Sequence, residues 1–233
     1  MVVTSVFTFI HLHKSAGTFV NNFIARFFKE KKIIGYHLPA RFIPQEFHSL
    51  PIIGCIRNPW DFYVSWYFFQ LQKQQSSPLF IAVSDNKKRD FNGTMERLLA
   101  LNENEELLLK ITKQLPDKFI NSGMNVPGPV LAKIHGSAIG LYSFLHQWMF
   151  FEAPSAPHML KVEDFPATLK EILISFDCDV SPDMQNYLLN GAPANKSSHN
   201  HYSYYYSKEI ADRVMGLDKS IINTYDYTYS SEC

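Results

Sequence analysis

The first 72 residues alternate between short apolar runs and stretches with helical periodicity, and this rhythm restricts the chain to few folds. Residues Val2–Leu12 are β-branched and aromatic, whereas Phe19–Lys31 carries apolar side chains at helical spacing. Short apolar runs follow at Ile33–Tyr36 and Pro51–Ile56, and a second helical pattern covers Trp60–Gln72. Near-continuous apolar strands that alternate with helices are typical of a parallel sheet covered on both faces. The sequence therefore predicts an α/β fold with a central parallel sheet flanked by helices in a three-layer sandwich.

The stretch from Lys73 to Pro157 lacks this rhythm. It contains polar loops and two helical patterns, at Thr94–Gln114 and Ser137–Glu152. We interpret it as a helical insertion, within a single domain of 233 residues, that shapes a substrate-binding site. A strand at His158–Val162 is expected to return to the sheet, and a final helix is expected near Tyr204–Asn223.

Charge and cysteine content exclude several classes of protein. Basic and acidic residues number 22 each, so the basic excess that accompanies nucleic-acid binding is absent and no nucleic-acid partner is expected. The three cysteines, Cys55, Cys178 and Cys233, form no CxxC pair and indicate neither a disulfide framework nor a zinc site. The N-terminal apolar run has no basic leader and is too short to span a bilayer. We expect a cytoplasmic protein without a transmembrane segment, in an oligomeric state that the sequence leaves open.

The strongest motif follows the first predicted strand and opens the first predicted helix. It reads His13-Lys14-Ser15-Ala16-Gly17-Thr18-Phe19. Backbone N–H groups at a helix start are unpaired, the helix dipole is positive there, and small residues let an anion approach closely. Lys14 adds a full charge, and Ser15 and Thr18 add hydroxyl donors. The motif predicts binding of a phosphate or phosphosulfate, with an ordinary strand–helix turn and an exposed lysine as the alternative.

This loop differs from the phosphate loop of nucleotide triphosphatases. That loop reads GxxxxGK[ST], with lysine after the second glycine, whereas Lys14 stands three residues before Gly17. The strand at Pro51–Ile56 is followed by Arg57, where a triphosphatase of this kind often has a Mg²⁺-binding aspartate. An arginine repels a metal ion and attracts a second anion. The sequence therefore favours a metal-free donor with two anionic groups over a P-loop nucleotide kinase.

A second anion site is indicated by Arg57 and Ser65. Ser65 stands eight residues after Arg57, about two turns into the next predicted helix. A guanidinium and a hydroxyl borne by a helix can converge on one phosphate. The alternative is that Arg57 pairs with a nearby carboxylate such as Asp61 and that Ser65 binds nothing.

Together these motifs resemble those of the superfamily of sulfotransferases that depend on 3′-phosphoadenosine 5′-phosphosulfate (PAPS), in particular its bacterial and carbohydrate-type members. The resemblance covers about Val2–Tyr67 and Pro157–Tyr227, where His158–Leu173 is similar to the family's strand-Glu-Asp-helix segment and Asp164 is the expected helix N-cap. It implies a fold related to the P-loop nucleotide-binding proteins. It also implies PAPS as co-substrate, the desulfonated nucleotide PAP as product, no metal, and an acceptor hydroxyl on a carbohydrate-like, phenolic or lipid molecule.

The resemblance assigns roles to the residues of both motifs. It implies that Lys14 stabilises the leaving oxygen and that the loop through Phe19 binds the 5′-phosphosulfate. It implies that Arg57 and Ser65 bind the 3′-phosphate.

Some positions depart from the family pattern or fit it loosely. Ala16 stands where many members have glycine, Asn58 replaces a frequent aspartate, and Asp226 replaces the usual glycine before the final tyrosine. Lys196 and Ser198 are candidates for a further contact with the 3′-phosphate, with a solvated loop as the alternative.

A base must take the proton of the acceptor hydroxyl. His37 follows the second predicted strand at its carboxyl end, the edge where open α/β sheets hold their sites, and related carbohydrate sulfotransferases carry a His or Glu base near this place. The alternative is a capping or surface histidine. Arg41 is a candidate for binding an anionic acceptor, or else for a salt bridge. His13 is expected to support the loop beside the substrate, and His11 to lie in the core. A non-catalytic nucleotide-binding module is the main alternative function.

Overall fold

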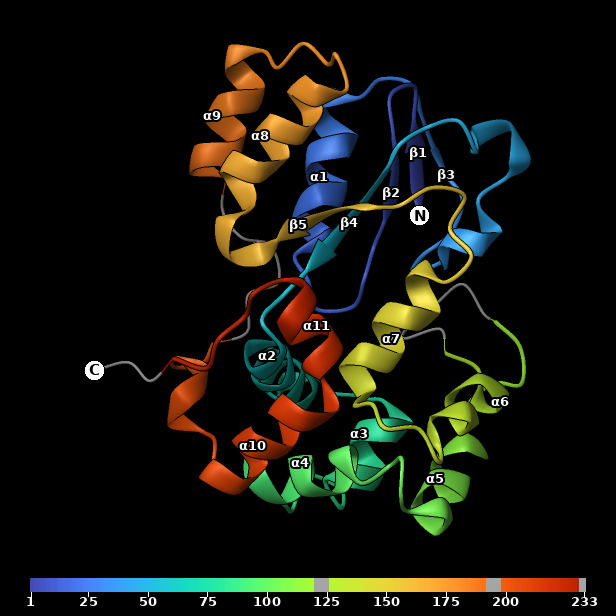
Figure 1. Ribbon diagram of the computed structural model, residues 1–233, viewed down its shortest axis with the longest axis vertical. Coiled ribbons are helices and arrows are strands. Elements are labelled where there is room, and N and C mark those ends of the chain that lie inside the picture. The colour runs from blue at the N-terminus through green and yellow to red at the C-terminus, as the bar shows by residue number, and fades with distance from the viewer. Residues whose placement is uncertain (120–125, 192–197, 231–233) are drawn as a thin grey trace. The chain divides into compact units, whose positions relative to one another are not determined.

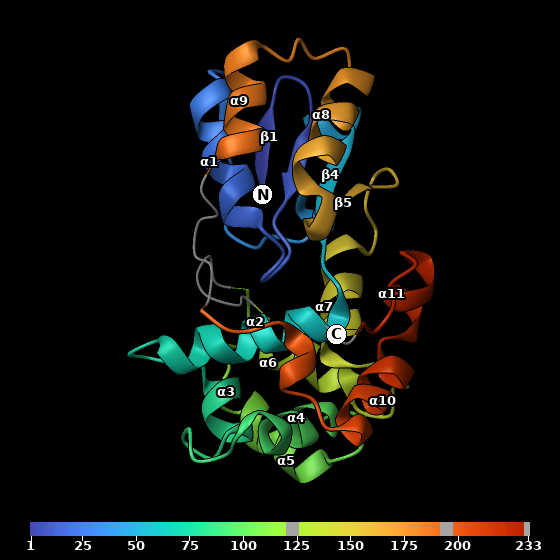
Figure 2. The same ribbon diagram turned by 90° about the vertical axis from the view of Figure 1, so that its left-hand side faces the viewer.

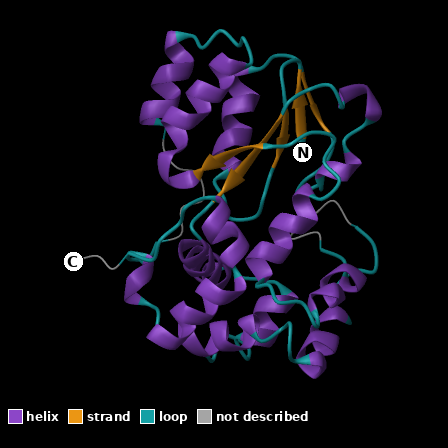
Figure 3. Cartoon of the chain, viewed as in Figure 1, coloured by secondary structure: helices purple, strands orange, loops and turns teal. Residues whose placement is uncertain are grey.

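The chain divides into two compact units in the computed structural model (Figure 1). Unit 1 combines Met1–Arg57 with Gln147–Lys196, and unit 2 combines Asn58–His146 with Ser197–Cys233. The structure describes residues 1–119, 126–191 and 198–230. Within these residues every strand belongs to unit 1 and unit 2 is helical, as the colouring of Figure 3 shows.

Unit 1 is built on a five-stranded sheet with the strand order β3-β1-β2-β4-β5. The strands are β1 (Val2–Thr4), β2 (Thr8–Ile10), β3 (Lys31–Ile33), β4 (Ile52–Ile56) and β5 (His158–Lys161). Strands β2, β4 and β5 are parallel, whereas β1 runs antiparallel to both β2 and β3. The sheet is therefore mixed. Strands β2, β3, β4 and β5 run in one direction, and the prediction of a parallel sheet is wrong for β1, which runs in the opposite direction.

The segment Val2–Leu12, predicted as one strand, folds as a hairpin whose turn is made by Thr4. The Thr4 hydroxyl accepts from the N–H groups of Val6 and Phe7 at 3.1 and 2.9 Å and donates to the Phe7 carbonyl at 2.9 Å. A threonine hydroxyl can replace backbone partners in this way, so the turn needs no glycine, proline or asparagine. For this reason the reversal of the chain was not predicted from the apolar sequence.

Three helices cover one face of the sheet: α1 (Gly17–Phe27), α8 (Phe165–Ser175) and α9 (Pro182–Asn190), seen together in Figures 1 and 2. Their buried side chains form one apolar cluster with alternate residues of the strands. The strand members of this cluster include Val2, Phe9, Ile53, Cys55 and Leu160. The predicted Asp164 does occupy the N-cap position of α8, but its side chain makes no capping hydrogen bond.

On the opposite face of the sheet, side chains pack directly against the backbone of β4. Gly54 lies between the two cluster residues of β4, so its α-carbon faces the other side of the sheet. A Cβ there would come within 2.6 Å of both Phe150, at the end of α7 (Leu141–Phe150), and the sulfur of Met159. The glycine is needed for this packing. A complete third layer remains a prediction.

Unit 2 is formed by helices, and α7 ends in unit 1 after beginning in unit 2. The other helices of unit 2 are α2 (Pro59–Gln72), α3 (Pro78–Val83), α4 (Phe91–Leu99), α5 (Glu105–Thr112), α6 (Gly128–Leu131), α10 (Lys208–Leu217) and α11 (Lys219–Thr224). The short 3-10 turns of the two units are η1 (Ala40–Phe42), η2 (Gln45–Phe47), η3 (Ala132–Ile134), η4 (Val162–Asp164) and η5 (Tyr202–Tyr204).

Helix α2 is buried on nearly all sides and packs against α4 and α10. The predicted helix at Thr94–Gln114 is interrupted, because the Asn104 side chain accepts from the N–H of Leu107 at 2.9 Å and starts α5 as a separate helix. Across the part of the chain that the structure describes, every helix is too short or too polar to span a bilayer.

Candidate active site

The loop between β2 and α1 exposes the start of the helix to a ligand. Lys14 and Ala16 both have left-handed backbone conformations, with φ of 54° and 53°. Ala16 is the N-cap residue, so it has no side chain that could bond the first-turn N–H groups, and the first turn contains no acidic residue. The N-cap residue therefore does not cap the positive end of α1 with a side chain of its own, a feature that favours anion binding at a helix start.

The predicted loop residues do not all face outward. Ser15 is fully buried, and its hydroxyl donates to the carbonyl of His13 at 3.2 Å. Phe19 packs edge-on against Phe165 in the core, with 5.2 Å between the ring centroids, so it has only backbone to offer a ligand. The half-buried side chains of Lys14, Ala16 and Thr18 remain as the accessible part of the motif.

Arg57 follows the last residue of β4 and reaches the loop. Its Nη1 donates to the main-chain oxygen of Lys14 at 3.2 Å. Because β2 and β4 are parallel neighbours, the residues that follow them emerge at the same edge of the sheet. The structure thus brings together the two cationic residues that sequence analysis placed in separate motifs.

Ser65, Ser198 and Lys196 are the remaining candidates for the donor site. Ser65 is 2% exposed within α2 and, like the exposed Ser198, belongs to unit 2, whereas Lys14 and Arg57 belong to unit 1. Lys196 lies outside the described residues.

His37 is held in a cluster of three buried histidines in unit 1. Its ring stacks on His13 with centroids 3.9 Å apart and an interplanar angle of 11°, and it lies 4.2 Å from the His11 ring. Its Nδ1 is 2.7 Å from the main-chain oxygen of His11. Since a carbonyl can only accept, Nδ1 carries the proton and Nε2 keeps its lone pair in the neutral ring. The geometry is that of a base with a fixed tautomer.

Burial makes the neutral forms of the His37 and His11 rings the stable ones. Loss of solvation lowers the pKa of His37 well below its usual range, and the neighbouring imidazoles of His13 and His11 lower it further. Burial also lowers the pKa of His11 to about 3. A neutral imidazole at physiological pH can accept a proton.

Arg41 is occupied by an aromatic partner. Its guanidinium lies 3.6 Å from the centroid of the Trp148 ring and donates from Nη1 to the Trp148 carbonyl at 3.3 Å. Burial lowers the Arg41 pKa, while the charge of Glu152 opposes that shift. The stacking partner could not be found from sequence, because it lies more than a hundred residues away.

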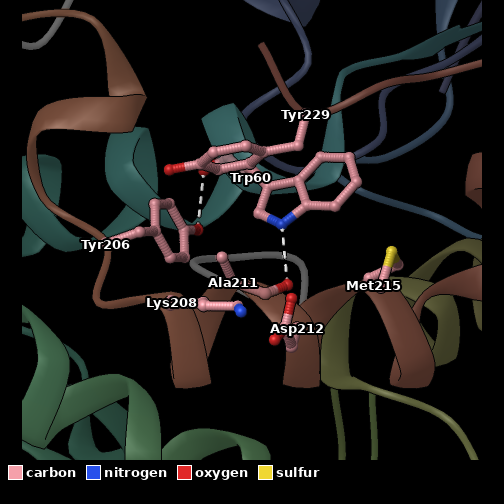
Figure 4. A pocket seen from close by; sticks show the side chains of 7 residues that line it. All are labelled: Trp60, Tyr206, Lys208, Ala211, Asp212, Met215 and Tyr229. Carbon is pink, nitrogen blue, oxygen red and sulfur yellow. Dashed lines mark hydrogen bonds between the residues drawn. The ribbon is translucent and has the colours of Figure 1, made fainter. Parts of the chain in front are cut away.

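A pocket of about 300 Å³ opens within unit 2 (Figure 4). It is lined by Trp60, Tyr206, Lys208, Ala211, Asp212, Met215 and Tyr229. The Trp60 indole donates to the Ala211 carbonyl at 3.0 Å and the Tyr206 hydroxyl donates to the Trp60 carbonyl at 2.8 Å, which fixes two of the aromatic walls. Tyr206 is the residue of the aromatic stretch Tyr202–Tyr206 that lines this pocket.

Unit 2 also contains a buried carboxylate, that of Asp218. It accepts from the Tyr63 hydroxyl at 2.7 Å and from the N–H of Ser143 at 2.8 Å, and the Tyr63 oxygen in turn accepts from the N–H of Tyr142 at 3.2 Å. Burial raises the pKa of Asp218, against the effect of the bonds from Tyr63 and Ser143. These contacts join α2, α7 and the start of α11 into one core.

Metal ligands do not gather in the described residues. Among residues 1–119, 126–191 and 198–230, no group of three or more His, Cys, Asp or Glu side chains is placed to hold a metal ion. His201 in the tail instead bonds the hydroxyl of Ser203 at 2.9 Å.

The structure is that of an α/β protein whose mixed sheet carries the Lys14 loop and Arg57 at adjacent strand ends, beside the start of α1. The family model described as the sulfotransferase domain matches residues 10–127, which is half of the chain and includes Lys14, Arg57 and Ser65. The chain belongs to the sulfotransferase domain family. No curated protein matches it.

Proposed function

We propose that this protein transfers a sulfuryl group from PAPS to an acceptor hydroxyl without a metal ion. The observation that supports the proposal most directly is the hydrogen bond between Arg57 and the Lys14 carbonyl, since it holds the Arg57 guanidinium against the backbone of the Lys14 loop. A donor with a phosphosulfate at one end and a phosphate at the other requires two such sites. Membership of the sulfotransferase domain family supports the same chemistry.

The donor-binding residues follow from the charges of unit 1. The backbone N–H groups at the start of α1, near Gly17 and Thr18, would hold the 5′-phosphate, because they lie at the positive end of the helix without a side-chain cap. PAPS supplies the sulfuryl group, and PAP is the product that leaves. The Lys14 ammonium would stabilise the negative charge that develops on the leaving oxygen, an electrostatic role that needs no metal.

Arg57 would hold the 3′-phosphate and so set the register of the nucleotide. A guanidinium offers paired N–H donors that match phosphate oxygens. Ser65, Lys196 and Ser198 are proposed as further partners of this phosphate, on the strength of the family resemblance.

His37 is the proposed base. Its Nδ1–H is held by the His11 carbonyl, so Nε2 is the atom that would accept the proton of the acceptor hydroxyl. The lowered pKa of His37 keeps Nε2 unprotonated over a wide pH range, and it also makes the ring a weaker base than an exposed imidazole.

The acceptor is proposed to be a hydroxyl-bearing carbohydrate-like molecule, phenol or lipid, bound with the help of the 73–157 segment. His13, stacked on the base, is a candidate for contact with it, and so is Arg41, whose stack on Trp148 would hold a guanidinium in place.

Calorimetric titration tests the donor. PAP should bind in the presence of a metal chelator, and ATP with Mg²⁺ should bind much more weakly. Tighter binding of Mg²⁺–ATP than of PAP would point to a nucleotide kinase instead.

Transfer assays test the reaction. PAPS and a panel of sugars, phenols and lipids should yield PAP and one sulfated product class. Tight PAP binding with no sulfated product from any acceptor, and with the Lys14→Ala variant indistinguishable from wild type, would identify a non-catalytic nucleotide-binding module.

A further inference from the structure

One buried histidine, which has no role in the proposed reaction, contacts both the start of α1 and the proposed base His37. His11 directly follows β2 and is 5% exposed. Its ring packs against Phe9, Tyr36 and His37, with centroids 6.2, 5.4 and 4.2 Å away. The sequence predicts a core histidine here. In the structure its Nδ1 also bonds Asn21 and its main-chain oxygen bonds His37.

On one side, the His11 imidazole fixes the first turns of α1. A Cβ on Gly17 would overlap the Cγ, Cδ2 and Nε2 atoms of this ring, so the ring lies directly against the glycine backbone where the anion-binding helix starts. One helical turn further on, the side-chain amide nitrogen of Asn21 donates to Nδ1 of His11 across 3.3 Å. With Nδ1 accepting, the proton of the neutral ring is on Nε2.

On the other side, His11 fixes His37. The main-chain oxygen of His11 accepts from the His37 Nδ1 at 2.7 Å, and the two rings are in contact. His37 has a left-handed backbone with φ of 48°, a conformation that persists in a non-glycine residue only where surrounding contacts hold it.

We infer that His11 is a positioning residue: its imidazole, wedged between Gly17 and His37 and bonded to Asn21, holds the anion-binding helix start and the base in one register. The inference rests on the proposed function for its catalytic meaning, although its structural part concerns contacts within unit 1 alone. The His11 ring packs against Gly17, whose backbone forms part of the proposed 5′-phosphate site, and against His37, so His11 acts through these two neighbours. A phenylalanine of similar ring size would fill the same space but would leave the Asn21 amide without its acceptor.

The effect of removing the imidazole separates positioning from simple packing. We expect His11→Ala to raise the dissociation constant of PAP and to lower kcat, each on the order of tenfold. In ¹⁵N NMR spectra the wild-type His37 should show a protonated Nδ1 and a bare Nε2, and His11→Ala should shift this signal toward a mixture of tautomers. Ile24→Val, which trims a 1% exposed core residue of α1, is the control for a loss of stability alone and should change neither readout.

Two further variants decide the matter if His11→Ala does not fold. Asn21 is half-buried on α1, so Asn21→Ala should fold and should still weaken PAP binding, by roughly threefold, since one hydrogen bond is lost. His11→Gln, which can keep an acceptor near Asn21, should fall between His11→Phe and wild type in PAP affinity.

The outcomes distinguish this inference from the proposed function. Wild-type PAP affinity and an unchanged His37 tautomer in Asn21→Ala and in whichever His11 variant folds would overturn the positioning role. If the wild-type protein binds no PAP, the proposed function fails, and the His37 tautomer in the same variants then decides the positioning role by itself. A changed tautomer would support it, and an unchanged one would overturn it.

Discussion

Nη1 of Arg57 lies 3.2 Å from the main-chain oxygen of Lys14 and donates a hydrogen bond to it. The bond joins the residue after β4 to the loop after β2 and orients one cationic side chain by the backbone of the other. The proposed site for two anionic groups would need both Lys14 and Arg57. The contribution of each residue to nucleotide affinity can be separated by comparing ligands with one and two phosphates.

Arg57→Ala should weaken PAP binding by about 10- to 100-fold, the usual effect of losing a charged hydrogen bond to phosphate. AMP, which lacks the 3′-phosphate, should lose much less affinity. Calorimetry with both nucleotides gives the ratio. If PAP keeps its full advantage over AMP in Arg57→Ala, the 3′-phosphate lies elsewhere.

Lys14→Ala should lower kcat by about 10²- to 10³-fold, because a preorganised charge at the leaving oxygen is removed. PAP affinity should change by only a few fold, since the helix start still binds the phosphate. Lys29→Ala, the same change at an exposed lysine of unit 1, is the matched control and should leave turnover at the wild-type rate. Equal losses in both variants would mean that Lys14 has no special role.

The pH dependence of turnover should show that His37 stays neutral in acid. Its pKa is held well below the usual value by burial and by His13 and His11, so kcat/KM should not fall near pH 6.5, where an exposed histidine would titrate. His37→Ala should lower kcat by about 10²- to 10⁴-fold at all pH values tested. Full kcat in this variant would assign the base to another residue.

The buried histidines should also make the fold sensitive to acid. The folded pKa of His11, about 3, and that of His37 lie below the unfolded value, so the unfolded chain binds more protons. The stabilisation is complete above about pH 6.5 and is lost as the pH falls toward the folded values, with a slope near 1 kcal/mol per pH unit for each ring. Urea denaturation between pH 7 and 4, followed by a signal from unit 1, measures how the free energy of unfolding depends on pH. His11→Phe should have a shallower slope, and an unchanged slope would assign the effect to other groups.

Tyr63→Phe should destabilise unit 2 by about 1–3 kcal/mol, because it leaves the fully buried Asp218 carboxylate without one donor. Tyr67→Phe is the control on the same helix, since its hydroxyl makes a longer, half-buried bond of 3.3 Å to the Arg89 carbonyl. Chemical denaturation of the two variants should give a clearly larger loss for Tyr63→Phe. Equal losses would mean that the buried network contributes nothing special.

Elements with simple periodicity were predictable from the sequence. The predictions at Pro51–Ile56, Trp60–Gln72 and His158–Val162 match β4, α2 and β5 within about one residue. Strands β1 and β3 were not predictable. The reversal of the chain after β1 depends on one hydroxyl, that of Thr4, and β3 (Lys31–Ile33) is exposed along its length and lacks an apolar pattern.

The candidate site was predictable where motif and strand end coincide. Lys14 and Arg57 do adjoin, because both follow parallel neighbours in the sheet. The contacts of His11 with Gly17 and of Arg41 with Trp148 were not predictable, since they are tertiary contacts between side chains that no local spacing specifies.

The pairing of β4 with β5 has a consequence for the newly made chain. Ile53 pairs with His158, and all of Asn58–His146 lies between them in the sequence. During synthesis, the edge of β4 that pairs with β5 therefore stays without its partner strand until the intervening residues have been made. An open apolar edge invites association with other chains, so slower growth at low temperature or chaperone co-expression should raise the yield of native protein.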